Sequence, residues 1–342
     1  MNNLPRGIQI LLLIEGVICN AAGGRLDSVQ LVQQHELRFT PWELVMAVAW
    51  SPDGTNLAVS AGDNIHLYRA DSWQQITTLH IGALTHSLAF SPQGGWLAAG
   101  SRDGYLRMWK LADLLSGQPA APVFIVLAHK KGVNGVSFSP DGQRLATGGN
   151  DAVARFWDPE EGIMTGMTIG GSFAVPSIAF TPDGATLAVV NGDKVRLREA
   201  GSERISGTFQ ADTSLYQVSF SPDGQLLAAT GSDDLIRLWQ VEQAYRTGQE
   251  RYPEPRLFSG HDGAAGTFRA LVWKVIFSPD GRLLVSAGGD GTVRLWETDT
   301  GKLLETYFAH PGGTTCLSLE ADGLRLASGG LDGSVKIWEV RP

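Results

Sequence analysis

The chain has 342 residues, of which 42 are glycine and 10 are tryptophan, while only 18% are charged. This composition is typical of many short buried strands joined by tight turns, and it argues against disorder over most of the length. The 27 basic and 35 acidic side chains give a formal net charge of −8. We therefore expect no general attraction to the phosphates of nucleic acids or to anionic lipids. The two cysteines, Cys19 and Cys316, are too far apart in sequence to predict a disulfide framework or a metal cluster.

The first 24 residues differ from the rest of the chain. Arg6 precedes an apolar run at residues 8–14, and small residues follow at 21–23, a pattern that resembles a secretory signal peptide. Glu15 departs from that pattern because it interrupts the apolar run early. Two interpretations stay open: a cleaved leader on an exported protein, or an N-terminal extension on a cytoplasmic one. The apolar run is shorter than the roughly 20 residues that span a bilayer, so no transmembrane anchor is predicted.

One tetrapeptide returns seven times after this segment. It reads SPDG in four copies, with SPQG, TPDG and EADG as variants, and the copies begin at Ser51, Ser91, Ser139, Thr181, Ser221, Ser278 and Glu320. Successive copies are 40 to 57 residues apart, which is the length of four short strands with their turns. Proline fixes φ and glycine adopts conformations that other residues avoid. Each tetrapeptide therefore predicts a tight corner between two antiparallel strands.

The corners have similar surroundings. An apolar strand precedes each corner, as at 45–50 and 272–277, and a second strand follows, as at 283–286. A fourth, more variable strand completes each unit, as at 302–308. The third strand ends in Tyr68, Trp109, Trp157, Trp239, Trp296 and Trp338 in six units, and in Arg198 in the fourth. The pattern predicts an all-β protein of seven four-stranded antiparallel units.

These units occupy one domain over residues 25–342. Their boundaries are 44–80, 84–129, 132–170, 174–210, 214–260, 269–309 and 313–342. The seventh unit ends after its third strand, while an unpaired strand at 29–38 precedes the first unit. That strand can pair with the last unit and close a ring, which removes two sheet edges that would otherwise invite aggregation.

The units resemble WD repeats, also called WD40 repeats, over roughly residues 29–342. The resemblance implies a seven-bladed β-propeller, in which four-stranded blades surround a central axis. In that family a His, a Ser or Thr, an Asp and the Trp form a hydrogen-bonded structural network inside a blade. Three units match this pattern, with His129, Thr147, Asp151 and Trp157, with His261, Ser286, Asp290 and Trp296, and with His310, Ser328, Asp332 and Trp338. Ala99 and Ala229 replace the hydroxyl residue in the second and fifth units, so we expect those blades to depend more on apolar packing.

The His, Ser and Asp of each set could also be interpreted as a catalytic triad. We favour a structural role, because the set recurs in three units and because a buried polar group without a partner costs about 1 to 3 kcal/mol. The corner aspartates could similarly form a calcium ring, but they lie on separate units and the turn already explains them. The sequence contains no phosphate-binding loop, HExxH helix or GxSxG elbow. We predict no catalytic site, no metal and no cofactor, although side chains that converge on a propeller channel can form an active site without a linear motif.

The resemblance places the usual docking surface on the face that carries the loops between blades. The residues five positions before each corner fall near this rim, and they are Met46, His86, Asn134, Pro176, Tyr216, Trp273 and Thr315. Tyr216 and Trp273 lie in neighbouring units, and the loop at 262–270 adds Phe268 and Arg269. Because Tyr, Trp and Arg are enriched at interface hot spots, these four residues form the first candidate site for a peptide or protein. The alternative is that the rings only plug the channel mouth or pack under the loop.

A second candidate on the same face is more polar. It comprises His86, Arg102, Asn134 and Asn150, which suit an acidic or hydrogen-bonding ligand. On the opposite face, insertions at 113–122 and 242–255 are interpreted as solvated linkers, with partner contacts as the alternative.

We therefore predict a monomeric interaction module or scaffold that binds a protein or peptide and does not bind nucleic acid. Because the chain carries repeats and little else, it resembles stand-alone propellers of bacteria. The alternative is an extracytoplasmic propeller that binds or hydrolyses a small ligand or glycan in its central channel. That alternative predicts a cluster of carboxylates in the channel, whereas the scaffold predicts an exposed aromatic patch.

Overall fold

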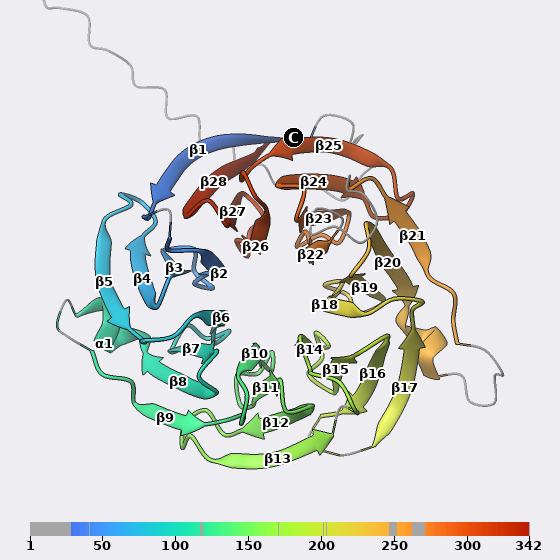
Figure 1. Ribbon diagram of the computed structural model, residues 1–342, viewed down its shortest axis with the longest axis horizontal. Helices are drawn as coiled ribbons and strands as arrows, with labels where there is room; N and C mark the ends of the chain where they lie inside the picture. Colours follow the sequence, from blue (N-terminus) through green and yellow to red (C-terminus); the bar gives the residue numbers. More distant parts are fainter. Residues whose placement is uncertain are drawn as a thin grey trace, which may run out of the picture.

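The computed structural model describes residues 29–40, 42–116, 118, 120–169, 171–200, 202, 204–245, 252–261 and 271–341. Within them, seven four-stranded antiparallel sheets stand around one central channel (Figure 1). The predicted seven-bladed β-propeller is thus confirmed. The segment at 1–24, with its signal-like pattern, lies outside the described residues.

In the first six blades the strands run outward from the centre of the ring in chain order (Figure 1). The first three blades consist of β2 (Val45–Trp50), β3 (Asn56–Ala61), β4 (Asn64–Arg69) and β5 (Gln75–His80), of β6 (Thr85–Phe90), β7 (Trp96–Ser101), β8 (Tyr105–Lys110) and β9 (Phe124–Leu127), and of β10 (Val133–Phe138), β11 (Leu145–Gly149), β12 (Val153–Trp157) and β13 (Met164–Ile169). The next three consist of β14 (Ile178–Phe180), β15 (Thr186–Asn191), β16 (Lys194–Glu199) and β17 (Ile205–Gln210), of β18 (Leu215–Phe220), β19 (Leu226–Gly231), β20 (Leu235–Gln240) and β21 (Arg256–Ser259), and of β22 (Val272–Phe277), β23 (Leu283–Gly288), β24 (Thr292–Glu297) and β25 (Leu303–Phe308).

The seventh blade joins the two ends of the chain. It consists of β26 (Thr314–Leu319), β27 (Arg325–Gly330), β28 (Ser334–Arg341) and the first strand, β1 (Gln30–Arg38). Strand β1 runs antiparallel to β28, with Gln30 opposite Arg341 and Arg38 opposite Ser334. Leu31 and Leu37 of β1 are buried, so the strand contributes apolar packing as well as backbone hydrogen bonds. The predicted closure by the N-terminal strand is confirmed.

The hydrophobic core lies between blades rather than in one central layer. Between blades 1 and 2, for example, Ile65 and Leu67 of β4 pack in one buried cluster with Leu97 of β7 and Trp109 of β8. Side chains alternate between the two faces of each strand, and each face of a blade meets a neighbouring blade. This explains why middle strands such as β3 and β23 are buried along their whole length.

The tetrapeptide corners join the first and second strands and define one face of the ring, here called the corner face. In the first corner, Gly54 has φ +68° and donates its backbone N–H to the carbonyl of Ser51 over 2.9 Å. The Ser51 hydroxyl donates to Asp53 and accepts from the backbone N–H of Asn56. The aspartate is therefore bound within its own corner, as the turn interpretation predicts. The opposite face, which carries the loops between blades, is called the loop face.

The fourth blade is formed without a tryptophan. Its inner strand β14 has only three residues, and Arg198 stands where the other blades have an aromatic ring. Val189 occupies the position of the network hydroxyl and is fully buried, and the arginine is 6% exposed. Apolar packing and the backbone ladder therefore hold this blade, as predicted for units that lack the network.

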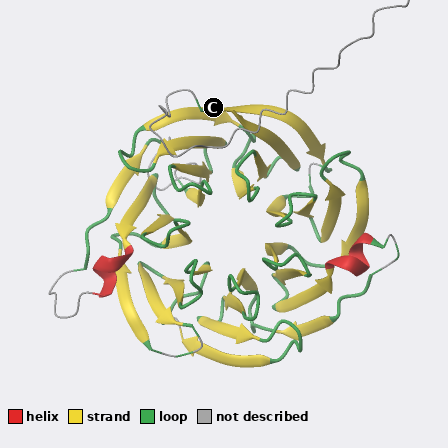
Figure 2. Cartoon of the chain, turned by 180° about the vertical axis from the view of Figure 1, so that it is seen from behind, coloured by secondary structure: helices red, strands yellow, loops and turns green. Residues whose placement is uncertain are grey.

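Two short helices lie on the outer edge of the ring (Figure 2). They are α1 (Leu111–Leu115) and the 3-10 helix η2 (Val241–Tyr245). Leu114 is fully buried in the core between blades 1 and 2, and Val241 is buried in the core between blades 4 and 5. The interpretation of the insertion at 113–122 as a solvated linker is thus wrong at its start, because Leu114 anchors it to the blades. In the insertion at 242–255, Ala244 packs against the core between blades 4 and 5. No helix in the described part of the chain is long and apolar enough to cross a bilayer.

Candidate partner-binding surface

The three His, hydroxyl, Asp and Trp sets are hydrogen-bonded as four-residue chains. In blade 3, Trp157 Nε1 donates to Thr147 Oγ1 over 2.9 Å, His129 Nε2 lies 2.8 Å from the same oxygen, and His129 Nδ1 lies 2.7 Å from Asp151. The same contacts, all between 2.7 and 3.0 Å, join His261, Ser286, Asp290 and Trp296 in blade 6, and His310, Ser328, Asp332 and Trp338 in blade 7.

In blade 3 both ring nitrogens of His129 have polar neighbours. The Thr147 hydroxyl accepts from the indole and contacts Nε2, while Nδ1 lies 2.7 Å from both Asp151 and the Arg155 guanidinium. Burial lowers the pKa of His129, which favours the neutral imidazole. Burial alone would raise the pKa of Asp151, but hydrogen bonds from His129 and Arg155 and their charges hold it below its ordinary value.

These sets cannot meet a substrate. Ser286 is fully buried, and His261 and Trp296 are each 1% exposed. A nucleophilic serine must reach the carbon that it attacks, and these hydroxyls are enclosed between strands. The geometry therefore supports the structural role that the sequence predicts for the twelve residues.

The sequence analysis missed a further member of these networks. Two positions before the tryptophan, an arginine forms an ion pair with the aspartate four residues earlier, as in Asp103–Arg107, Asp151–Arg155, Asp233–Arg237 and Asp290–Arg294. The recurring Arg-x-Trp in these third strands was a readable signal of this pairing. The ion pairs close the turn between the second and third strands.

A cavity of about 480 Å³ opens at the loop-face end of the central channel and is here called the loop-face pocket. Its lining includes all seven residues that stand five positions before a corner, together with Asn150, so the whole set of equivalent positions surrounds one opening. The seven blades contribute seven different side-chain types at this rim: Met46, His86, Asn134, Pro176, Tyr216, Trp273 and Thr315.

The two candidate sites of the sequence analysis are parts of this one pocket. Tyr216 and Trp273 line it on one side, and His86, Asn134 and Asn150 line it on the other. The Asn134 amide donates to Asn150 Oδ1 over 2.8 Å, which joins the polar residues into one group. Arg102 is exposed and is not part of the lining. Phe268 and Arg269 lie outside the described residues.

Gly313 leaves the space that the Trp273 ring occupies. A methyl group at Gly313 would meet the indole at 2.7 Å, and the same methyl would lie 3.5 Å from Gly289 Cα. The ring therefore packs against the loop that leads into blade 7 and is half-buried, while its remaining surface lines the pocket. Trp273 thus both packs against a loop and lines the pocket, so each of the two predicted surroundings describes part of its surface.

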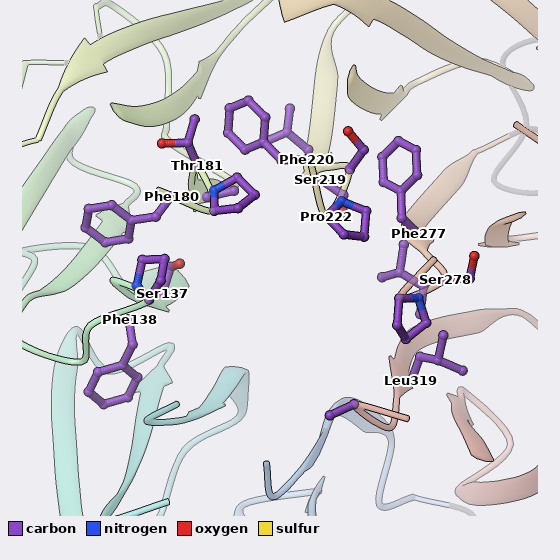
Figure 3. A pocket seen from close by; sticks show the side chains of 18 of the residues that line it. Ser137, Phe138, Phe180, Thr181, Ser219, Phe220, Pro222, Phe277, Ser278 and Leu319 are labelled. Carbon is purple, nitrogen blue, oxygen red and sulfur yellow. The ribbon is translucent and has the colours of Figure 1, made fainter. Parts of the chain in front are cut away.

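The other end of the channel is more uniform. An opening of about 450 Å³ is surrounded by the corners of several blades, and Phe138, Phe180, Phe220 and Phe277 lie around it (Figure 3). Three of these four rings are buried at 8% exposure, so they pack between blades rather than face a ligand. The prolines of the corners form the exposed rim.

Carboxylates are scarce at both openings. In the described lining of the two cavities the single carboxylate is Glu320, which forms an ion pair with Arg325 at 2.7 Å. No group of three His, Cys, Asp or Glu side chains within the described ranges is placed to hold a metal ion. The alternative of a glycan-binding or hydrolytic channel, which predicts a carboxylate cluster there, is not supported.

Gln217 and Lys274 also line the loop-face pocket, and the sequence analysis did not select them. Each stands one residue after the positions that were compared, at Tyr216 and Trp273. A comparison of the next position across the seven units would have found them.

Comparison with known proteins agrees with this architecture. The WD domain, G-beta repeat family matches six segments, at residues 32–68, 73–110, 121–158, 204–240, 254–297 and 301–339. The unmatched stretch between 158 and 204 contains β14 to β16 of the blade without a tryptophan.

Relatives align over most of the chain. The serine-threonine kinase receptor-associated protein of Gallus gallus is 27% identical over 260 residues, which cover 75% of this chain and 68% of the relative. The human protein of that name is 26% identical over the same shares. The Protein LST8 homolog of Drosophila melanogaster is 23% identical over 297 residues, which cover 82% of this chain and 75% of the relative. The chain, with its seven blades and its repeated network, belongs to the WD40 (WD domain, G-beta repeat) family.

Proposed function

We propose that this WD-repeat protein, an interaction scaffold by family and architecture, binds a peptide segment of its partner in the loop-face pocket. The observation that carries the proposal is the difference between the two ends of one channel. The corner end repeats the same residue types from blade to blade, whereas the loop end presents different side chains from each blade. Repeated residues suit a structural rim, and a varied rim suits recognition of one particular ligand.

The composition of the pocket supports a peptide as the ligand. Its volume of about 480 Å³ lies within the range of cavities that bury small ligands or a few side chains. Tyr216 and Trp273 provide large rigid surfaces, and Asn134 and Asn150 provide amide groups for main-chain hydrogen bonds. The net charge of −8 and the absence of arginine from the described lining argue against nucleic acid as the ligand.

We also propose that the protein is not an enzyme and acts as a monomer. The buried state of the three His, hydroxyl and Asp sets supports the first statement. Pairing of β1 with β28 supports the second, because it leaves no blade with a missing strand for another copy to fill.

A peptide library displayed on phage tests the binding site directly. We expect selection on the protein to enrich a sequence motif, and we expect Tyr216→Ala and Trp273→Ala to lower the affinity of the selected peptides by at least tenfold. Gln225→Ala, an exposed residue of a corner on the opposite face, serves as the matched control and should leave affinity unchanged. Selected peptides that bind both pocket variants as well as the parent protein would overturn the proposal.

A further inference from the structure

Lys274 stands at a position that has a repeated structural task in other blades. Four residues before the corner, the inner strand carries Ser87 in blade 2, Ser177 in blade 4 and Gln217 in blade 5. Each accepts a hydrogen bond from a backbone N–H of the next blade's inner strand, with distances of 3.0, 3.3 and 2.8 Å. In these three blades, the side chain at this position thus joins one blade to the next.

A lysine cannot perform that task. Its ammonium has three donors and no acceptor, so it has no lone pair to offer to the backbone of blade 7. Among the described residues, Lys274 has neither an ion-pair partner nor a hydrogen-bond acceptor, and its side chain lines the loop-face pocket. The neighbouring Cys316 does not balance the charge, because burial raises the pKa of that thiol to about 11 and keeps it neutral.

Apart from His86, Lys274 is the one basic side chain in the described lining of the pocket. His86 is half-buried, and burial, with a smaller contribution from Arg102, lowers its pKa, which favours the neutral imidazole. Lys274 itself keeps some surface in the pocket, yet burial lowers the pKa of its ammonium. A desolvated charge without a partner destabilises the folded protein. A methionine would fill the same space without that cost.

We propose that Lys274 is the counter-ion for a carboxylate, and that the loop-face pocket receives an Asp or Glu side chain of an acidic peptide segment. This inference rests on the proposed function, because it names the chemical class of the peptide that the pocket binds. A carboxylate would supply the partner that the Lys274 amine lacks among the described residues.

The charge count favours a carboxylate over a phosphate. One lysine balances one carboxylate, whereas a phosphorylated side chain carries a charge of about −1.5 to −2 and is typically bound by a cluster of arginines. The described lining contains no arginine and no second lysine. Aromatic and apolar side chains, including Trp273 and Met46, would surround the bound pair and reduce its screening by water.

The test uses the full chain labelled with ¹⁵N at tryptophan, in which the indole signal of Trp273 is assigned by its loss in Trp273→Phe. Three probes are titrated: a capped pentapeptide with a central Glu between glycines, the same peptide with Gln, and inorganic phosphate. We expect the Glu peptide to shift the Trp273 signal saturably, with an affinity at least tenfold above that of the Gln peptide. Equal binding of the two peptides, or binding of phosphate in preference to the Glu peptide, would overturn the inference.

Two lysine variants separate recognition from structure. Lys274→Met should lower the affinity for the Glu peptide at least tenfold and should leave the urea unfolding midpoint equal or higher, because a desolvated charge is removed. Lys336→Met, which removes a half-buried lysine of β28 outside the pocket, is the matched control and should retain the affinity. A lower midpoint with unchanged peptide affinity in Lys274→Met would identify a structural lysine and overturn the inference.

The chain's own carboxylates are the remaining competitor. Asp262 lies outside the described residues but is close to Lys274 in sequence. A tenfold gain in affinity for the Glu peptide in Asp262→Asn would show that this carboxylate occupies the site, which would overturn the inference of a peptide partner. The inference about the carboxylate can fail while the proposed function holds. Neutral peptides that are selected on phage and that lose affinity in Trp273→Ala would still support peptide binding in the pocket.

Discussion

Replacement of Ser286 by alanine removes the central atom of the blade 6 network without changing the shape of the core. In the folded protein the Ser286 hydroxyl accepts from Trp296 Nε1 over 2.8 Å and lies 2.7 Å from His261 Nε2. Ser286→Ala leaves both nitrogens buried without a partner. Each unsatisfied group costs about 1 to 3 kcal/mol, so we expect the free energy of unfolding to fall by about 2 to 5 kcal/mol.

The comparison within the chain shows why the loss should be larger than in other blades. Blade 2 has Ala99 at the equivalent position, and there Trp109 Nε1 is buried without a hydrogen-bond partner. Ile81 stands where the histidine would be, so blade 2 tolerates one unsatisfied donor among apolar neighbours. Ser286→Ala would leave two such groups.

Urea unfolding followed by far-UV circular dichroism measures the effect at pH 7.5. Ser219→Ala is the matched control, because Ser219 is a half-buried serine of an inner strand whose hydroxyl makes no hydrogen bond to the described residues. We expect this variant to change the free energy of unfolding by less than about 0.5 kcal/mol. A double-mutant cycle with Trp296→Phe isolates the indole bond, and we expect a coupling of about 1 to 2 kcal/mol. A loss below about 0.5 kcal/mol for Ser286→Ala, or zero coupling in the cycle, would refute the argument that the network stabilises the blade.

Three further predictions follow from the same geometry. Gly313→Ala should shift the Trp273 indole signal and lower the unfolding midpoint, because the glycine has φ +134° and the added methyl meets the ring; an unchanged signal would contradict the packing. Leu31→Ala should lower the free energy of unfolding by about 2 to 4 kcal/mol, because this leucine of the closing strand is 5% exposed. Urea unfolding measures this change, and a loss under about 1 kcal/mol would mean that β1 does not stabilise the ring. The free energy of unfolding should fall as the pH drops from 6.5 toward the lowered pKa of His129, because the unfolded histidine binds a proton that the folded one resists. The free energy of unfolding should change with pH by up to about 1.4 kcal/mol per pH unit for one histidine, and this dependence should be weaker in His129→Gln. An equal pH dependence in both proteins would contradict the lowered pKa of His129.

The strands and the network could be predicted from the sequence because each depends on local order along the chain. A proline and a glycine at fixed spacing set the corner, and the positions of His, hydroxyl, Asp and Trp then follow by counting from it. The same counting identified the rim residues, since equivalent positions of a repeat must occupy equivalent places around the axis.

The union of the two candidate sites could not be predicted in this way. His86 and Trp273 are far apart in sequence and belong to blades 2 and 6, and only closure of the ring brings them to one opening. The anchoring of α1 was also missed, because Leu114 meets residues of the preceding blade that no local pattern identifies. The role of Lys274 became visible only when the hydrogen bonds of Ser87, Ser177 and Gln217 showed what its position does elsewhere.

The two ends of the channel differ for a physical reason. At the corner face, the backbone turn fixes the residue types, because the proline, the aspartate and the glycine each satisfy a requirement of the corner itself. At the loop face, the side chains five positions before the corner line the opening, and their contacts differ from blade to blade. Asn134 donates to the Val175 carbonyl and Thr315 to the Gly329 carbonyl, so no single residue type is required at this position. Trp273 and the neighbouring Lys274 depart furthest from what packing alone requires. Trp273 needs a glycine at 313 to fit beside it, and Lys274 has no acceptor for the inter-blade hydrogen bond that Gln217 accepts in blade 5. Both residues lower stability, and both lie at the same opening. This is expected where binding, rather than folding, determines which side chain is present.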